Sequence, residues 1–524
     1  MEKWFFDNYW AHWGIFSVII IVVVLIMVMG FIYLERRGIG RFQIRPGPNR
    51  CGPLGLLQPI ADAIKVLLKE DIVPAKGDKW VHWLAPIAVF VPPLLIFAVI
   101  PFHNEWGLIS DLNVGIIYII AISSLSVVGV FMAGWGSSNK FSSVAAMRTI
   151  AQMISYEIPL VLAIVGVILV TGSLSMNEIV GAQDIPFFLL QPLGFIIFFI
   201  ATAAEINRTP TDLLEAESEI VAGYHTEYSG MKFALFYLGE YTHAFAASAI
   251  ITTLFLSGWR GPAPEMLGWL WFVIKVFLVF FVIFWIRSTI PRLRIDQMMS
   301  FAWKCLLPLA LINMFITAAE VIVWEGGLPW WLIFVNIAIA AILISLWAIG
   351  FKFWTKEHSF GIAKGLGLTF KHLLRHPITT QYPEERLTQS RRHRGNELLW
   401  DEAKCTGCLS CQRACPHGVI RIETSRVDKK IQVDKFEADL GLCMFCGLCV
   451  EACPTKSLFL GYNYEQATYR RDDLIWDKDK LRISPEKQPS GYAHPEIAAL
   501  LPQQTLLIDG KRWSSKKPTP FWKK

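Results

Sequence analysis

Charged residues are scarce in this chain of 524 residues. They make up 18% of it, against about 25% in a typical soluble domain, while hydrophobic residues make up 54%. The sequence has no strand followed by GxGxxG and a helix and no GxxxxGK[ST] motif, so it offers no nucleotide-binding site of its own. No run of basic and aromatic residues predicts a nucleic-acid-binding face. The composition is that of a membrane protein.

A secretion signal is also missing. The first residues, MEKWFFDNYWAHWGIF, have no basic n-region and no small-residue cleavage site before the first apolar run, which we expect to be retained as a membrane span. Few cysteines lie outside two short motifs: eight of the ten are in the motifs, and Cys51 and Cys305 stand alone. Secreted disulfide scaffolds are short and follow a signal peptide, so this distribution indicates a reducing compartment.

Long apolar runs are present up to residue 351. A span needs about 20 apolar residues, and nine windows qualify: 12–34, 83–101, 114–135, 154–172, 188–206, 238–257, 269–287, 304–324 and 329–350. The loops on one side contain 17 Lys or Arg, whereas the other side has only Lys3 and Arg260. Because basic loops stay in the cytoplasm, we expect the N-terminus outside and the chain inside after the ninth span. Between the first two spans, PLGLLQPIADAIKVLLKED predicts an amphipathic surface helix.

Eight cysteines form two copies of one motif, CTGCLSCQRACP at 405–416 and CMFCGLCVEACP at 443–454. Bacterial ferredoxins hold two [4Fe–4S] clusters with this spacing, and the fourth cysteine of each run ligates the other cluster. The expected ligand sets are Cys405, Cys408, Cys411 and Cys453 for one cluster, and Cys415, Cys443, Cys446 and Cys449 for the other. Zinc sites or disulfides are the alternatives, but neither needs this run of four cysteines twice. The segment between the motifs predicts a hairpin and a loop.

The charge balance changes along the chain, from a net −3 over residues 1–351 to +9 over residues 352–524. The basic half is expected to lie near anionic lipid headgroups or an acidic partner subunit. We divide the chain into a transmembrane domain at 1–351, a linker and amphipathic surface helix at 352–400, an iron–sulfur domain with its following segment at 401–485, and a Pro-rich basic extension at 486–524.

Carboxylates gather near predicted spans. Ionisable groups at membrane depth cost about 2.5–3.5 kcal/mol on insertion scales and tend to mark proton or ion paths. The candidates for proton coupling are Glu157, Glu205, Asp212, Glu215, Glu217, Glu219, Glu227 and Glu240. An ordinary solvated loop is the alternative for 207–230. Lys275, within the seventh span, fits a structural role as well as a functional one.

The segment ERRGIGRFQIRPGPNRCGPLGLLQP at 35–59 is rich in Gly and Pro and carries five arginines, among them Arg36 and Arg37. It predicts either a simple cytoplasmic anchor or a functional surface. The functional alternatives are a docking floor for a soluble partner and the mouth of a lipid-substrate cavity.

Several of these segments closely resemble the quinone-chamber membrane subunit of respiratory complex I, the H subunit of the bacterial enzyme. They include RPGPNRCGPLGLLQPIADAIKVLLKEDIVP, AQMISYEIP, AEINRTPTDLLEAESEIVAGYHTEYSGMKFALFYLGEY and IRSTIPRLRIDQMMSFAWKCLLPLALIN, and the resemblance covers about residues 12–350. Residues 361–485 resemble the I subunit. Within them, GLGLTFKHLLRHPITTQYPEE looks like the N-terminal surface helix of that subunit. Leu214 stands where the family usually has proline, and the two subunits are ordinarily separate chains.

The resemblance implies a multi-pass α-helical membrane bundle of about nine spans, followed by a small α+β ferredoxin-like 2[4Fe–4S] domain. It implies a subunit of a proton-pumping NADH:quinone oxidoreductase in the bacterial inner membrane, with the iron–sulfur domain on the cytoplasmic side. Electrons would pass through two [4Fe–4S] clusters to a terminal cluster in a neighbouring subunit and then to quinone. The glutamates among the candidates match the family's acidic channel, and Arg36 matches an arginine near the quinone chamber, with Arg37 beside it.

The implied partners are the subunits that bind the quinone headgroup and the terminal cluster, the antiporter-like membrane subunits, the NADH-input module, quinone and membrane lipid. Three alternatives remain open at this point. One is the equivalent subunit of a ferredoxin-fed relative or an energy-converting membrane hydrogenase. Another is a membrane anchor for a ferredoxin domain, which would need only one or two spans. The last is a carrier with a redox sensor, although the membrane half shows none of the inverted repeats common in transporters.

Overall fold

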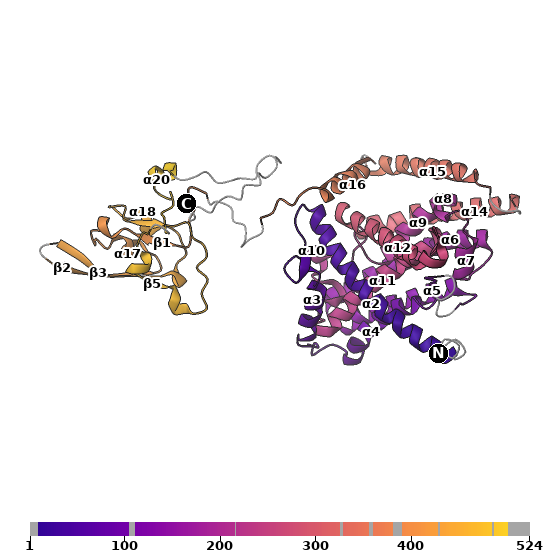
Figure 1. Ribbon diagram of the computed structural model, residues 1–524, viewed down its shortest axis with the longest axis horizontal. Helices are drawn as coiled ribbons and strands as arrows, with labels where there is room; N and C mark the ends of the chain where they lie inside the picture. Colours follow the sequence, from indigo (N-terminus) through magenta and orange to yellow (C-terminus); the bar gives the residue numbers. More distant parts are fainter. Residues whose placement is uncertain are drawn as a thin grey trace. The chain divides into compact units, whose positions relative to one another are not determined.

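The computed structural model describes residues 9–103, 111–214, 216–324, 329–355, 360–380, 390–427, 430–484 and 487–500. It divides into two compact units, Met1–Pro377 and Ile378–Lys524. The first is helical, and the second combines short helices with strands (Figure 1). The division between them lies inside the predicted linker at 352–400. Most of the predicted extension at 486–524 lies outside the described residues.

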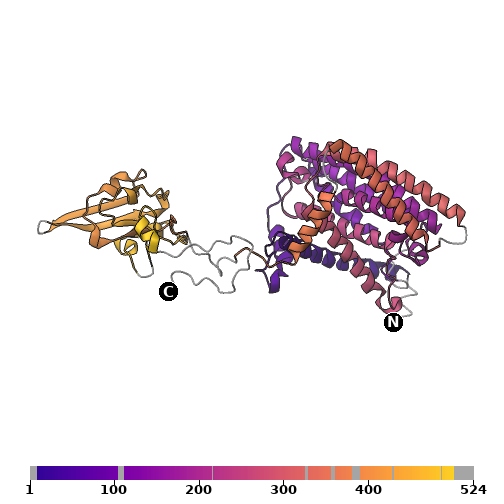
Figure 2. The ribbon, with the colours of Figure 1, turned by 90° about the horizontal axis from the view of Figure 1, so that it is seen from above.

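Helices lie side by side in the first unit (Figure 2). They are α2 Tyr9–Phe42, α3 Gln58–Leu67, α4 Lys79–Ile96, α5 Gly115–Gly136, α6 Lys140–Thr171, α7 Met176–Ala182, α8 Phe187–Leu190, α9 Pro192–Glu205, α10 Glu217–Ile220, α11 Gly230–Phe255, α12 Pro264–Thr289, α13 Ile295–Phe301, α14 Leu307–Val323, α15 Leu332–Thr355 and α16 Phe360–Leu373. A π-helical turn, Ala302–Leu306, joins α13 to α14.

All nine predicted spans fall on helices, but their number is not settled by length and composition. Within the described residues, six helices are long and apolar enough to cross a bilayer: Gly14–Phe42, Lys79–Ile96, Gly115–Gly136, Lys140–Thr171, Pro264–Thr289 and Ile295–Val323. Two further apolar helices, Pro192–Glu205 and Leu332–Trp347, are shorter. The long helix α11 is not among the six, because hydroxyl, histidine and glutamate side chains lower its hydropathy. A multi-pass helical bundle is therefore confirmed, and nine spans stays a prediction.

Local sequence sets where several helices begin and end. The Asp78 side chain accepts hydrogen bonds from the backbone N–H groups of Trp80 and Val81, which caps the start of α4. Asn139 caps α6 in the same way. Gly172 ends α6 with a left-handed φ of 68°, a conformation that glycine adopts without strain.

Two helices of this unit lie at its surface. None of the side chains of α3 is buried, and Ile60, Ile64 and Leu67 on it are exposed, as expected for an amphipathic helix at a membrane surface. Helix α16 packs against α2 and α12. The indole N–H of Trp285 donates to the Thr369 hydroxyl at 3.1 Å, and the Trp285 ring lies 5.3 Å from that of Phe370.

The second unit contains two small antiparallel sheets. Strand β1 Leu398–Trp400 pairs with β4 Leu458–Leu460, and β2 Ile420–Val427 pairs with β3 Lys430–Asp439, which pairs with β5 Ile475–Asp477. The expected hairpin between the cysteine motifs is thus present as β2 and β3. The short helices are α17 Ser410–Ala414, α18 Leu448–Glu451, α19 Lys478–Leu481 and α20 Pro495–Leu500.

Aromatic side chains fill the core of the second unit. Trp400 is 1% exposed and stacks on Phe436, with ring centroids 5.1 Å apart. Trp476 packs in the same core, and six of the motif cysteines pack against it. The two cysteine loops therefore pack against this core.

Candidate functional site

The two cysteine motifs fold into loops of matching conformation, displaced by 38 residues along the chain. Asp401 and Asp439 each cap a short 3-10 turn that leads into the first cysteine of a motif. Within the motifs, Gly407 and Phe445 occupy one equivalent position and have φ values of 65° and 50°. Leu409 and Gly447 occupy the next, with φ values of 61° and 83°. These left-handed residues turn the backbone around each group of cysteines.

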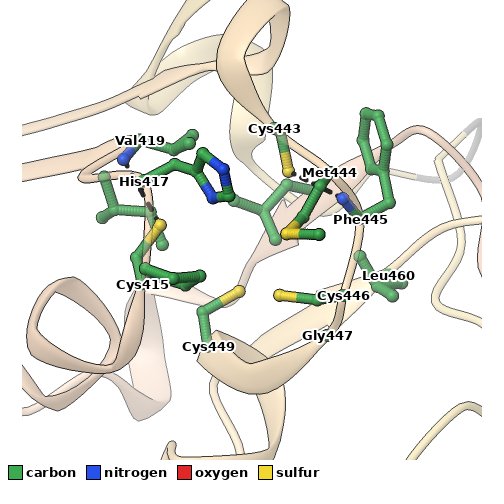
Figure 3. Close-up of a pocket in the computed structure, with 13 residues that line it drawn as sticks. Cys415, His417, Val419, Cys443, Met444, Phe445, Cys446, Gly447, Cys449 and Leu460 are labelled. Carbon is green, nitrogen blue, oxygen red and sulfur yellow. Dashed lines mark hydrogen bonds between the residues drawn. The ribbon is translucent and has the colours of Figure 1, made fainter.

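Four cysteines line the cavity in Figure 3, which has an empty volume of about 460 Å³ including its open mouth. They are Cys415 from the first motif and Cys443, Cys446 and Cys449 from the second, and their sulfur atoms face a common space. Two backbone N–H groups donate to these sulfurs, that of Val419 to Cys415 Sγ at 3.3 Å and that of Phe445 to Cys443 Sγ at 3.4 Å. Such bonds stabilise negative charge on sulfur.

The other four motif cysteines line a second cavity, of about 340 Å³: Cys405, Cys408, Cys411 and Cys453. Here the backbone N–H of Ser457 donates to Cys453 Sγ at 3.3 Å, and the Ser457 hydroxyl lies 3.3 Å from the same sulfur. The Cys408 thiol lies 3.4 Å from the Ser410 hydroxyl. Each cavity thus combines three cysteines of one motif with the fourth of the other, the crossed arrangement that the spacing predicts.

The donor sets suit [4Fe–4S] clusters, which are held by four cysteine thiolates. A single zinc ion would need four ligands within about 2.3 Å of one point. In the part of the chain that the structure describes, no three His, Cys, Asp or Glu side chains are grouped to hold a single metal ion. All ten cysteines are free thiols. Burial raises the pKa of Cys411 to about 11 and that of Cys449 to about 12, so these thiols lose their protons on binding iron.

The charged groups of the helical unit centre on Arg208, which follows α9 and is 3% exposed. Its Nη1 lies 3.0 Å from Glu35 Oε1, and its Nε lies 3.2 Å from Glu240 Oε1. Arg287 of α12 also pairs with Glu35. The Arg208 guanidinium lies over the Tyr241 ring, 4.4 Å from its centroid. Two arginines and two glutamates thereby join four segments of the bundle in a charge-balanced group.

Three more predicted carboxylates have other partners in the helical unit. Asp212 pairs with Arg292 at 3.0 Å. Glu205, at the end of α9, lies 3.8 Å from His243 Nε2, and its charge interacts with that of Glu157. Glu157 accepts a hydrogen bond from Ser124. Glu157 and Glu240 lie within α6 and α11, which begin at Lys140 and Gly230.

The remaining predicted carboxylates are less enclosed. Glu219 is exposed and pairs with Arg148 at 2.6 Å. Glu227 accepts a hydrogen bond from Asn139 at 2.6 Å. The backbone of Glu217 begins α10, whereas its side chain and the whole of Glu215 lie outside the described residues. The positions of Glu219 and Glu227 are therefore also compatible with an ordinary solvated loop.

The arginine-rich loop meets the start of the surface helix α3. Arg36 pairs with Asp62 of α3 at 2.5 Å, and Arg37 donates to the Tyr33 hydroxyl at 2.8 Å and to the Leu54 carbonyl at 2.7 Å. Arg36 therefore fixes α3 to the end of α2, and Arg37 fixes the turn Pro53–Gly55 that precedes α3. Lys275 donates to three backbone carbonyls that follow α11, those of Leu256, Gly258 and Arg260. Of its two predicted roles, these contacts support the structural one.

The ion pairs around Arg208 and Asp212 include residues that were not predicted from the sequence, among them Glu35, Arg287 and Arg292. One feature of the sequence could have identified Glu35 as a candidate: it lies at the end of an apolar run and next to the arginines of the 35–59 segment. Nothing in the spacing of the sequence indicates that Glu35 meets an arginine 252 positions away.

Comparison with known proteins agrees with both units. Residues 15–318 match the family model described as NADH dehydrogenase, and residues 404–457 match the 4Fe-4S dicluster domain. The chain is 60% identical over 346 residues to the H subunit of NADH-quinone oxidoreductase from Dehalococcoides mccartyi strain CBDB1, covering 66% of this chain and 97% of the relative. It is 49% identical over 326 residues to the H subunit from Brevibacillus brevis, covering 60% and 96%. The chain belongs to the NADH dehydrogenase family of membrane proteins and carries a 4Fe–4S dicluster domain in the same polypeptide.

Proposed function

We propose that this chain is the membrane-and-electron-transfer subunit of a proton-pumping NADH:quinone oxidoreductase. In this proposal the chain passes electrons through two [4Fe–4S] clusters towards quinone, and its helical unit walls the quinone chamber and carries proton-coupling carboxylates. The crossed lining of the two cavities, three cysteines from one motif and one from the other, supports it most directly. A chain with no nucleotide-binding motif also needs a separate subunit to receive electrons from the donor.

Eight cysteines are assigned to the clusters. Cys405, Cys408, Cys411 and Cys453 would hold one, and Cys415, Cys443, Cys446 and Cys449 the other. When bound, each cluster accepts and passes on one electron. The N–H groups of Val419, Phe445 and Ser457 stabilise the added negative charge on the sulfurs, and the adjoining aromatic core keeps water from their inner side.

Proton coupling is assigned to Glu157, Glu205, Asp212, Glu215, Glu217, Glu219, Glu227 and Glu240. Arg208 supports this assignment because it lies between Glu35 and Glu240. A proton added to Glu240 weakens its attraction to Arg208, and the guanidinium then pairs more strongly with Glu35. A change of charge at one carboxylate is thereby felt by its neighbours, as a proton relay requires.

The quinone chamber is assigned to the region around Arg36 and Arg37, where the end of α2 meets α3. The exposed apolar residues of α3 suit a lipid interface and the entry of an isoprenoid tail from the membrane. The headgroup-binding, terminal-cluster, antiporter-like and NADH-input subunits complete the proposed assembly, in the bacterial inner membrane with the clusters on the cytoplasmic side.

Single cysteine variants test the cluster assignment. Cys408→Ala and Cys446→Ala remove one ligand from each cavity, and Cys51→Ala, outside the motifs, is the control. In the purified complex, each motif variant should lose about four iron atoms and one EPR signal of the tetranuclear type, and the two lost signals should differ. Retention of both signals in either variant would contradict the assignment.

Inverted membrane vesicles test the reaction. NADH should drive both quinone reduction and internal acidification, and both should fail with Cys408→Ala. If reduced ferredoxin drives both and NADH drives neither, the donor is different and the chain serves a ferredoxin-fed relative. Quinone reduction without acidification would refute the proton-coupling role of the carboxylates.

A further inference from the structure

The break between α8 and α9 exposes polar groups inside the helical bundle. Gln191, between the two helices, has φ −125° and ψ 62°, so the helical hydrogen bonding is interrupted there; Pro192, which begins α9, disfavours a helical conformation in the residue before it. The freed carbonyl of Leu190 accepts a hydrogen bond from Asn336 Nδ2 of α15 at 2.7 Å. The Gln191 side chain turns inward, is 4% exposed, and donates through Nε2 to the Gly166 carbonyl of α6 at 3.0 Å.

A carboxyl group faces this break. Glu320 of α14 is 8% exposed, and its Oε2 accepts from Asn336 Nδ2 at 3.3 Å. The helices around Glu320 are α6, α8, α9, α14 and α15. Among the described residues that line the cavity here, Glu320 is the only titratable one, and no Lys or Arg is present. An ionised carboxylate would therefore lie in the bundle without a compensating cation, which is energetically costly.

Three buried polar atoms beside Glu320 have no hydrogen-bond partner: Gln191 Oε1, Asn313 Nδ2 and Asn336 Oδ1. The bonds of Gln191 Nε2 and Asn336 Nδ2 fix which end of each of these two amides is the oxygen. The three residues and Glu320 line one cavity. Buried polar groups without partners are rare, and an enclosed water commonly satisfies several of them.

The cavity has room for water, since its empty volume is about 270 Å³ including the space at its mouth. Two glycines lie against polar side chains that line it. A Cβ on Gly194 would lie 3.0 Å from Asn313 Nδ2 and 3.6 Å from Gln191 Oε1, and one on Gly166 would lie 3.4 Å and 3.2 Å from the same atoms.

We propose that this cavity is a proton-binding site, in which Glu320 is a neutral carboxylic acid that shares one enclosed water with Gln191, Asn313 and Asn336. The hydrogen bonds then balance. A water accepts two hydrogen bonds and donates two. It accepts from the Glu320 O–H and from Asn313 Nδ2, and it donates to Gln191 Oε1 and Asn336 Oδ1.

Other occupants of the cavity would leave a hydrogen-bonding group without a partner or in an unfavourable contact. With an ionised Glu320, the water would face three acceptors and one donor, so an acceptor would remain without a partner. A sodium ion would suit the oxygens but would repel the N–H groups of Asn313. The neutral acid with one water gives a hydrogen bond to each of the three unpartnered atoms, and it does so whether or not the proposed electron-transfer function holds.

Infrared spectroscopy of the purified complex tests the site, because a protonated carboxyl has a carbonyl-stretch band separate from those of carboxylates and amides. The band assigned to Glu320 should be present at neutral pH, should shift in D₂O and should be absent in Glu320→Gln. Gly194→Ala places a methyl group against Asn313 Nδ2 and Gln191 Oε1 and should shift the same band. Gly30→Ala is the matched control, because its Cβ would meet nothing within 4 Å, and the band should not change.

Two results would overturn the proposal. One is a wild-type spectrum that matches that of Glu320→Gln in the region of the protonated-carboxyl band, which would show an ionised carboxylate. The other is a band that weakens when NaCl replaces KCl, which would show a sodium site. The wild-type comparison of the two salts needs no variant, and a cryo-EM map of the complex with ordered waters gives an independent check. Density for one water within hydrogen-bond distance of Gln191, Asn313 and Asn336 supports the site, and a dry cavity refutes it.

Discussion

Replacing Glu35 by glutamine removes one negative charge from between two arginines. The Glu35 side chain is 3% exposed and pairs with Arg208, also 3% exposed, and with Arg287. In the variant, Arg208 keeps its pair with Glu240, whereas Arg287, whose side chain is 26% exposed, loses the glutamate with which it pairs.

Breaking a buried ion pair by removing one partner costs about 3–5 kcal/mol. Glutamine keeps the shape of the side chain and one acceptor oxygen, so we expect a value of about 3 kcal/mol for Glu35→Gln. At 1.4 kcal/mol per factor of ten, this corresponds to roughly a hundredfold larger population of the opened bundle. The control is Asp296→Asn, since the Arg294–Asp296 pair is 72% and 66% exposed. An exposed pair of this kind contributes about 0–1 kcal/mol.

The assay is the reaction of Cys305 with a maleimide in the purified complex, measured by mass spectrometry of its peptide. Cys305 is 3% exposed in the turn before α14, so it reacts only when the bundle opens. Labelling should occur at a lower temperature in Glu35→Gln than in the wild type or in Asp296→Asn. Arg287→Gln should be destabilised as well, and the double variant should be more stable than the sum of the two changes predicts. Additive effects, or a Glu35→Gln protein as stable as the wild type, would refute the interpretation of this group as a coupled ion-pair network.

Three further predictions concern the iron–sulfur unit. Trp400→Ala removes a fully buried ring from its stack on Phe436 and should destabilise the unit by about 3–5 kcal/mol, measured by hydrogen exchange of the strands. Gly447→Ala should abolish one of the two cluster signals in EPR, because φ is 83° and the new Cβ would lie 2.4 Å from the Tyr492 ring; Gly418→Ala, with φ of 61° but nothing within 4 Å, should have a milder effect. Removal of iron by a chelator under reducing conditions should increase hydrogen exchange around both cysteine loops while leaving exchange in the helical unit unchanged, since the cysteines lie along the core of the second unit alone.

Much of the architecture follows from local sequence. An apolar run long enough to cross a bilayer must satisfy its backbone hydrogen bonds internally, so it forms a helix wherever it packs. The predicted windows accordingly fall on helices. The cysteine spacing indicates which four sulfurs belong together, because cluster chemistry restricts the choice, and the same two sets line the two cavities. Glu205, Asp212 and Glu240 could be selected from sequence as costly charges near apolar runs.

What the sequence leaves undetermined is how buried polar groups pair across the bundle. Glu35 meets Arg208 and Arg287 across 173 and 252 positions, and Asn336 meets the Leu190 carbonyl across 146. No periodicity encodes such contacts, because they depend on which helices are neighbours and how far each is rotated. Hydrophobic runs and cysteine spacing are local properties of the chain, and they determined the two kinds of domain and the grouping of the sulfurs. Only the packed structure decides which buried charge is compensated, which carboxyl has no cation nearby, and where a cavity remains beside it.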